Sequence, residues 1–314
     1  MPLPEPQYTH HFYFLSFQLP IETEIVDLSG NSIKLLPNKT FSPILKTIDL
    51  SGNGLVRLEL NAFADLRELT KLDLSSNNLD SKEQELFRGC REVQELNLSR
   101  NSLTQIPDKG FQLLTKLVKL DLSNNMLNDP TFGAEYVSID RLEYVDLSGN
   151  NFMQIHHHSF QVLRDLKTLN LSNSQVHSIE TSSLELLDLS GNNLAEVTSV
   201  DMSAAKNFRK VDLSHNKLQT LPSLQLTRLT DLDISHNSIK SLLQQSFENS
   251  EDLMKVDVSH NLLTTFDSSL FHRNNELETL DMSHNNIVEI VPIEYLEVTL
   301  KNNVSRILIS IAKE

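Results

Sequence analysis

Cysteine is nearly absent from this sequence of 314 residues, and positive charge is scarce. Cys90 is the single cysteine, so no disulfide can form within the chain. Lys and Arg number 27 against 42 Asp and Glu, and the net charge of −15 argues against nucleic acid or an anionic membrane as a partner. No apolar run reaches the roughly 18 residues that a membrane-spanning helix needs, so we expect no transmembrane segment.

The motifs of catalysis are missing as well. We find no glycine-rich phosphate loop, no nucleophile elbow and no metal-ligand spacing. Cys90 is better explained as a small packed residue than as a nucleophile. The sequence therefore predicts a protein that is not an enzyme and that uses no cofactor and no metal.

The sequence does contain an internal repeat, and its clearest copy is LDLSSNNL at residues 72–79. Ser174 marks a degraded copy. Neighbouring copies lie 18 to 25 residues apart, most often 24, and a period of this size indicates a solenoid. Eleven copies carry an asparagine at the same place: Asn31, Asn53, Asn77, Asn101, Asn125, Asn150, Asn192, Asn216, Asn237, Asn261 and Asn285.

The pattern L-x-x-L-x-L-x-x-N-x-L, formed here by Leu69, Leu72, Leu74, Asn77 and Leu79, resembles the leucine-rich repeat family. An apolar residue, often a proline, and then a phenylalanine follow the asparagine. This longer unit is similar to the typical subclass of animal extracellular proteins, with units of about 24 residues. The resemblance implies an α/β fold: a curved solenoid, or horseshoe, with a parallel β-sheet on its concave face and irregular or short-helical convex segments.

Three parts are expected along the chain. Residues 1–20 form an irregular N-terminal segment, residues 21–295 a solenoid of about 12 repeats, and residues 296–314 a C-terminal tail or capping segment. That tail is expected to form either a last strand or an amphipathic helix. A degenerate short repeat at 174–191 has two interpretations: an isoform or gene-model deletion, or a functional kink between two subdomains.

Each unit can be interpreted residue by residue. The alternation of Leu72, Asp73 and Leu74 predicts a short strand with the leucines inside and the aspartate outside. Asn77 is expected to satisfy the turning backbone of adjacent coils. The charged segment 80–85 is expected to form a short convex helix. An aromatic or large apolar residue recurs ten residues after the asparagine, and we expect a spine near the convex side: Phe41, Phe63, Phe87, Phe111, Phe160, Met202, Phe247, Phe271 and Tyr295.

The outward positions of the strands predict the binding face. One position forms an aspartate ladder, interrupted by Asn97 and Asn170, although Asp is also simply common at this place in such repeats. Two residues earlier the side chains vary strongly, which favours recognition. Tyr144 is the proposed aromatic anchor, or it only shields the coil beneath it. We predict a concave ligand-binding site across Lys71, Asp73, Glu95, Lys119, Asp121, Tyr144 and Asp146.

Histidines recur in the C-terminal half. Four consecutive repeats have His before the asparagine, and stacked coils would place them in a row. Such a row could sense pH or hold a metal, but Ser-His-Asn is a frequent variant in this family, and we prefer that explanation. The triplet at 156–158 is expected to be solvated. The row consists of His215, His236, His260 and His284.

Four asparagines begin sequons for N-glycosylation: Asn38, Asn97, Asn170 and Asn303. They matter if the chain is secreted. Asn38 falls in an expected loop and is the strongest candidate. Asn97 and Asn170 fall in expected strands, where the sequon arises whenever Asn precedes the Leu-Ser of the repeat.

The resemblance implies a recognition module for a protein or glycan ligand, in an extracellular receptor, adhesion or innate-immune protein. The alternatives are a structural or adhesion protein that self-associates, for example as a homodimer, and an intracellular scaffold. Extracellular members usually have cysteine-rich caps, but residues 1–18 contain no cysteine and no convincing signal peptide. We therefore expect either an incomplete extracellular protein or an uncapped cytoplasmic one.

Overall fold

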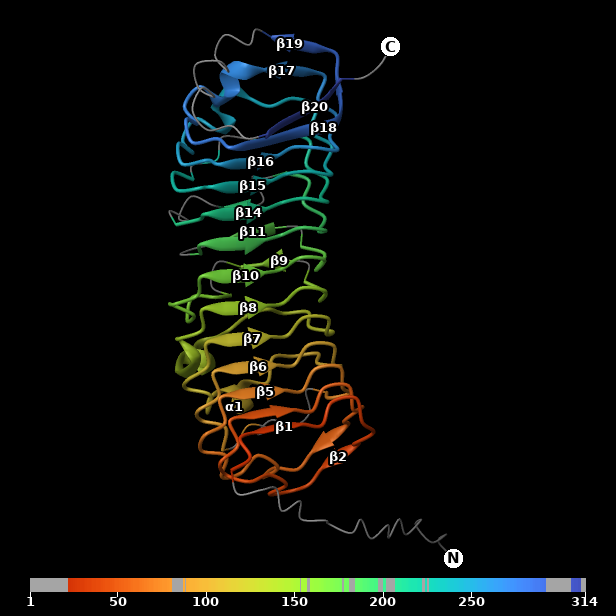
Figure 1. The fold of residues 1–314 in the computed structure, drawn as a ribbon, viewed down its shortest axis with the longest axis vertical. Coiled ribbons are helices and arrows are strands. Elements are labelled where there is room, and N and C mark those ends of the chain that lie inside the picture. Colours follow the sequence, from red (N-terminus) through yellow and green to blue (C-terminus); the bar gives the residue numbers. More distant parts are fainter. Residues whose placement is uncertain are drawn as a thin grey trace, which may run out of the picture.

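Thirteen short strands form one parallel sheet in the computed structural model, and they lie side by side in sequence order (Figure 1). The structure describes residues 22–80, 87, 89–152, 154–156, 159–176, 178–180, 184–196, 200–201, 207–221, 224, 226–291 and 306–311. The strands of this sheet are β1 (Ile25–Asp27), β3 (Thr47–Asp49), β5 (Lys71–Asp73), β6 (Glu95–Asn97), β7 (Lys119–Asp121), β8 (Tyr144–Asp146), β10 (Thr168–Asn170), β12 (Leu186–Asp188), β14 (Lys210–Asp212), β15 (Asp231–Asp233), β16 (Lys255–Asp257), β18 (Thr279–Ile287) and β20 (Arg306–Ile311).

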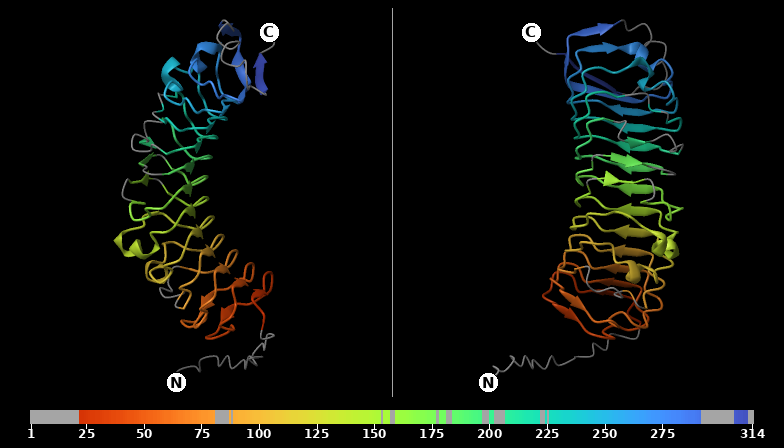
Figure 2. Two further views of the ribbon diagram at one scale, coloured as in Figure 1. Left: turned by 60° about the vertical axis from the view of Figure 1, so that its left-hand side comes forward. Right: turned by 180° about the vertical axis from the view of Figure 1, so that it is seen from behind.

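The stack of coils is curved, with this sheet along its concave side (Figure 2, left). Short helical segments lie on the convex side: α1 (Asp108–Phe111), η1 (Ala134–Ile139), η3 (Gln244–Ser246) and η4 (Ser268–Phe271). Three smaller parallel sheets pair β2 (Leu35–Leu36) with β4 (Arg57–Leu58), β11 (Ser178–Glu180) with β9 (Gln154–Ile155) and β13 (Val200–Asp201), and β17 (Thr265–Asp267) with β19 (Glu289–Val291). The predicted leucine-rich-repeat solenoid is confirmed.

The strands follow from the alternation of apolar and polar residues. In β5, Leu72 is 1% exposed, while Lys71 and Asp73 on either side point outward. Strands β5, β6 and β7 pair without a shift, so Lys71 lies beside Glu95, and Glu95 beside Lys119. The inward residues merge into one hydrophobic core that runs from coil to coil. Burying one leucine contributes about 1.5–3 kcal/mol, and each coil depends on its neighbours for that burial.

The repeat asparagine connects consecutive coils. Asn77 donates from Nδ2 to the carbonyl of Leu50 in the preceding coil (3.0 Å) and to that of Leu74 in its own coil (3.0 Å). Its Oδ1 accepts the backbone N–H groups of Asn53 (3.1 Å) and Leu55 (2.8 Å). Because these backbone groups are buried where the chain turns, the amide supplies partners that water cannot. The predicted role of the asparagine is confirmed.

The convex side carries runs of aromatic rings, as the sequence predicts. Phe87 and Phe111 lie 5.7 Å apart between centroids, and Phe247 and Phe271 lie 4.7 Å apart. In the coil after Asn125, Glu135 occupies the position where most other coils have an aromatic residue. Aromatic residues at other positions of this coil take its place, which the repeat pattern does not predict. Two other residues of that coil connect Phe111 to Phe160 through edge and tilted contacts, namely Tyr136 and Phe132.

The short repeat at Ser174 does not interrupt the sheet. Strand β10 pairs with β8 and with β12 without a shift, so the sheet is continuous through this coil. Ser174 is buried, and its hydroxyl donates to the carbonyls of Leu147 (3.2 Å) and Ser172 (3.0 Å). The N–H of Phe152 donates to the backbone carbonyl of Ser174 (2.8 Å) instead of to an asparagine side chain.

At the C-terminal end β20 pairs with β18 and extends the sheet, which is the strand alternative of the expectation. Some expectations fall outside the described residues: the irregular segment 1–20, the helix at 80–85 apart from Asp80 and the spine positions Met202 and Tyr295. The same holds for two of the three adjacent histidines and for the sequon at Asn303.

Candidate functional site

The aspartate ladder has a structural task in every coil. In each of ten coils the aspartate Oδ1 accepts the backbone N–H of the serine two residues later, at 2.8–2.9 Å. This bond ends the strand and begins the turn. Oδ1 of each ladder aspartate is therefore engaged by the turn of its own coil. The ladder residues are Asp27, Asp49, Asp73, Asp121, Asp146, Asp188, Asp212, Asp233, Asp257 and Asp281.

Two asparagines interrupt the ladder and bind their neighbours. Asn97 Nδ2 donates to Asp73 Oδ2 (3.0 Å), and Asn170 Nδ2 donates to Asp146 Oδ2 (3.1 Å). Elsewhere the carboxylates lie beside one another and are half-buried, except Asp27 at the N-terminal end, which is exposed. Burial raises the pKa of Asp121, and the charge of Asp146 raises it further, although bonds from Ser123 oppose the shift. Burial likewise raises the pKa of Asp188, so at these two positions of the ladder the surroundings disfavour the charged carboxylate.

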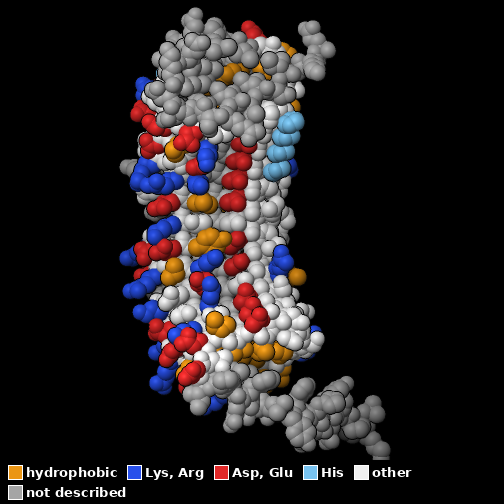
Figure 3. Space-filling view, in the orientation of Figure 1, with side chains coloured by type: hydrophobic (Ala, Val, Ile, Leu, Met, Phe, Trp, Pro, Cys, Tyr) orange, Lys and Arg blue, Asp and Glu red, His pale blue; other side chains and the backbone are white. Residues whose placement is uncertain are grey.

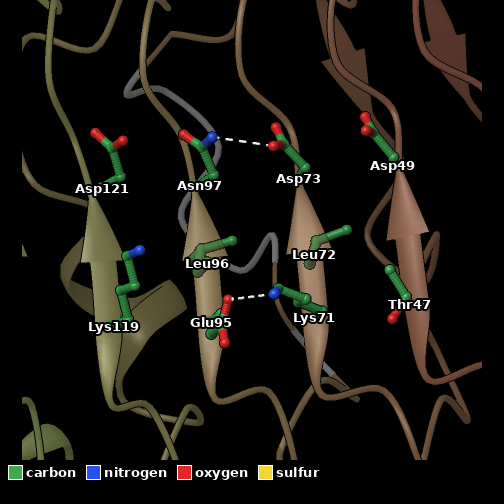
Figure 4. A pocket seen from close by; sticks show the side chains of 10 residues that line it. All are labelled: Thr47, Asp49, Lys71, Leu72, Asp73, Glu95, Leu96, Asn97, Lys119 and Asp121. Carbon is green, nitrogen blue, oxygen red and sulfur yellow. Dashed lines mark hydrogen bonds and ion pairs between the residues drawn. The ribbon is translucent and has the colours of Figure 1, made fainter.

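The N-terminal part of the sheet forms a shallow hollow of about 310 Å³, the N-terminal hollow (Figure 4). Lys71 Nζ contacts Glu95 Oε2 at 2.7 Å across neighbouring strands. Both side chains are about half exposed, so the pair contributes little stability and remains accessible to a partner. The lining residues are Thr47, Asp49, Lys71, Leu72, Asp73, Glu95, Leu96, Asn97, Lys119 and Asp121.

Five of the seven predicted site residues line this hollow; Tyr144 and Asp146 lie on the next strand. Lys119 Nζ is 5.0 Å from the centroid of the half-buried Tyr144 ring, a cation–π contact that links the tyrosine to the hollow. The Tyr144 hydroxyl donates to Asp146 Oδ2 (3.3 Å). Burial and the Asp146 charge raise the pKa of Tyr144 to about 12, so the phenol stays neutral at physiological pH.

A second hollow of about 490 Å³, the C-terminal hollow, lies on the same face, and the sequence analysis did not single it out. Asp231 Oδ1 lies between Lys210 Nζ (3.9 Å) and Lys255 Nζ (3.8 Å). Lys210, Asp231 and Lys255 occupy the same variable outward position in their strands that Lys71 occupies in β5. The sequence pattern that predicted Lys71 as a site residue was therefore present here too. The lining residues are Leu186, Leu187, Asp188, Lys210, Val211, Asp212, Asp231, Leu232, Asp233, Lys255, Val256, Asp257, Thr279 and Asp281.

The four predicted histidines form a stacked row beside the ladder, here named the histidine column (Figure 3). Each ring lies 4.1 Å from the next between centroids, with interplanar angles of 10–14°. All four are exposed. Burial and the flanking His215 and His260 lower the pKa of His236, against the opposite influence of Asp233 and Asp257. Among the described residues no cluster of three or more His, Cys, Asp or Glu could hold a metal ion.

The remaining candidates are placed as follows. Asn38 is exposed in a loop, which suits glycosylation, and its Oδ1 accepts the N–H of Asn61 (2.8 Å). The amides of Asn97 and Asn170 are engaged in the ladder. Cys90 is fully buried, and burial raises the pKa of its thiol to about 12, so it is a packed residue. Among the described residues no helix has the length and apolar character to cross a membrane.

The model of the family described as leucine rich repeat matches residues 22–79, 67–127, 140–194 and 227–287. These ranges cover more than half of the sequence, and the chain belongs to the leucine-rich repeat family. No curated protein matches the sequence.

Solved structures share the fold at low sequence identity. A chain of the octameric complex of Latrophilin 3, Unc5D and FLRT2 is 20% identical to this chain, with a TM-score of 0.73. The match covers 90% of this chain and 87% of that chain. A chain of the LRIM1/APL1C complex is 21% identical to this chain, with a TM-score of 0.64. The match covers 90% of this chain and 60% of that chain. A chain of the Drosophila Toll–Spatzle complex is 19% identical with a TM-score of 0.63, covering 93% of this chain and 50% of its own. This chain thus spans half the length of the Toll–Spatzle chain that it matches.

Proposed function

We propose that this chain is a non-enzymatic protein-recognition module of an extracellular leucine-rich repeat protein, and that its partner lies across the N-terminal hollow. The observation that carries the proposal is the hollow itself. It presents the variable side chains Lys71, Glu95 and Lys119 side by side on a rigid sheet. A rigid scaffold that presents variable side chains loses little conformational entropy when it binds.

The chemistry of the face supports a protein partner. Charged groups of both signs alternate along β5, β6 and β7, and Tyr144 adds an aromatic ring at the edge. Interfaces are enriched in tyrosine, and their mixed charges steer association and select the partner. The structural neighbours include chains taken from protein–protein complexes, which favours the same use of the fold. The extracellular location is proposed from the same neighbours.

The test is alanine substitution measured against a matched control. Tyr144→Ala should weaken binding of the partner about tenfold or more, because tyrosine is enriched among the few residues that carry most of the interface energy. Gln112→Ala is the control, since Gln112 is exposed and follows α1 on the convex side. Affinities would be measured by surface plasmon resonance, and circular dichroism would verify the fold of each variant.

A second variant separates the ring from its hydroxyl. Tyr144→Phe keeps the ring under Lys119 and removes only the bond to Asp146. We expect a loss of less than about threefold for this variant. If Gln112→Ala abolished binding and Tyr144→Ala left it unchanged, the partner would lie on the convex side and the proposal would be wrong.

A further inference from the structure

The histidine column occupies a backbone position that does not require histidine. His215, His236, His260 and His284 all have φ between 53° and 56°. The same turn position is held by glycine in four other coils and by Asn124 (φ 54°) in another. Glycine suits such left-handed backbone best. The geometry of the turn therefore does not explain four consecutive imidazoles.

The backbone holds these rings in a fixed row. The N–H of each of His215, His236 and His260 donates to a serine carbonyl of the following coil, at 3.0 Å. The ring spacing of 4.1 Å follows from this stacking of coils. Protonation of two neighbouring rings would therefore place two positive charges on rings whose centroids are 4.1 Å apart. Because such charges repel, a protonated ring disfavours protonation of its neighbours, and besides burial the flanking His215 and His260 lower the pKa of His236 in this way.

Acidic side chains lie beside this column (Figure 3). Asp233 and Asp257, which act on His236, line the C-terminal hollow, and this hollow is more acidic than the N-terminal hollow. Six carboxylates and two lysines line it, a net charge of −4, whereas four carboxylates and two lysines line the other, a net charge of −2. No asparagine interrupts the ladder from Asp188 to Asp281. The charged groups that act on His236 are Asp233 and Asp257 of the ladder and the rings of His215 and His260.

We propose that the C-terminal hollow is a second subsite, which binds a cationic segment of the protein partner, and that the histidine column makes this binding pH-dependent. The inference rests on the proposed recognition function and adds the chemistry of one contact. While the imidazoles are unprotonated, the ladder attracts cations. Imidazoles that gain protons as pH falls place positive charge beside the ladder, and a cationic segment is then held less tightly.

The test uses octalysine as the probe and isothermal titration calorimetry at pH 7.5 and 5.5 in the same salt. The parent protein should bind the peptide about fivefold more weakly at pH 5.5. A variant with all four histidines of the column replaced by asparagine should change by less than about twofold. Asparagine is the matched replacement because Asn124 and Asn173 already hold this left-handed turn position in other coils.

A pair of charge variants locates the peptide. Asp212→Asn with Asp257→Asn should weaken octalysine binding at pH 7.5 more than Asp49→Asn with Asp73→Asn does. Asparagine at a ladder position keeps the turn, since Asn97 Oδ1 accepts the N–H of Ser99 (3.0 Å) as the aspartates do. The two variants thus remove equal charge from the two hollows.

The outcomes are distinct. If the fourfold histidine variant lost affinity at pH 5.5 as the parent does, the column would not be the cause and the pH-dependence would be overturned. If the parent did not bind octalysine at pH 7.5, or the N-terminal pair mattered more, the cationic subsite would be overturned. The proposed recognition function is judged separately, by Tyr144→Ala with the protein partner.

Discussion

Replacement of a repeat asparagine tests the physical basis of the fold, and Asn125→Ala is the most informative choice. Asn125 is 8% exposed in the middle of the stack. Its Nδ2 donates to the carbonyls of Leu98 (3.0 Å) and Leu122 (3.0 Å), and its Oδ1 accepts the N–H of Leu103 (3.0 Å). The alanine variant removes all of these partners.

The expected loss of unfolding free energy follows from the groups left behind. A buried donor or acceptor without a partner costs about 1–3 kcal/mol. The N–H of Leu103 is such a donor, and each of the two carbonyls loses one of its partners. We therefore expect a destabilisation of about 1–3 kcal/mol for the variant, with the higher end reached if water cannot enter.

The assay is urea unfolding followed by circular dichroism, with two controls from the same chain. Asn128→Ala removes an exposed asparagine and should stay within about 0.5 kcal/mol of the parent. Asn31→Ala, in the first described coil, removes an exposed amide whose donated bonds among the described residues go to Leu28 and Ser29 of its own coil, so its effect should be smaller than that of Asn125→Ala. Equal midpoints for the parent and Asn125→Ala would refute the reasoning.

Three further predictions concern the edge, the thiol and the histidines. Hydrogen exchange should be faster in β1 than in β7, because among the described strands β1 pairs only with β3, and Ile25 is 67% exposed; uniform protection would show that something covers β1. A thiol reagent at pH 8 should label Cys90 only after unfolding, because the thiol is buried with its pKa raised to about 12; rapid labelling of the native protein would contradict that burial. His236 should titrate below 6.5 by NMR, and replacing His215 and His260 by asparagine should raise its midpoint; an unchanged midpoint would mean that the flanking rings do not lower it.

Much of the fold could be predicted from the sequence because the repeat encodes it locally. The spacing of Leu72, Leu74 and Asn77 determines a strand and a turn, and stacking repeats that geometry. The aromatic contacts of one coil could not be predicted. Tyr136 and Phe132 stand outside the periodic slot, and only the path of η1 brings their rings between Phe111 and Phe160.

The sequence predicted which face of the solenoid holds the candidate site, but not how far the site extends along that face. The outward position of each strand is periodic, so Lys71, Glu95 and Lys119 could be expected side by side. Which outward residues surround a hollow depends on the curvature and on side-chain rotamers, which the repeat pattern does not specify. The C-terminal hollow was missed for this reason, although Lys210 and Lys255 have the same pattern. The row of histidines was expected, but the regular ring stacking follows only from the distance between coils.

Site-specific photo-cross-linking tests the central claim, that the concave face binds the partner, most directly. A benzophenone amino acid would replace Thr47 at the N-terminal hollow, Thr168 between the hollows, Thr279 at the C-terminal hollow and Gln112 on the convex side. Each variant would be irradiated with the partner, and the cross-linked product quantified. We predict products from the concave positions, strongest at Thr47, and little from Gln112. Products that came mainly from Gln112 would contradict the assignment of the binding face.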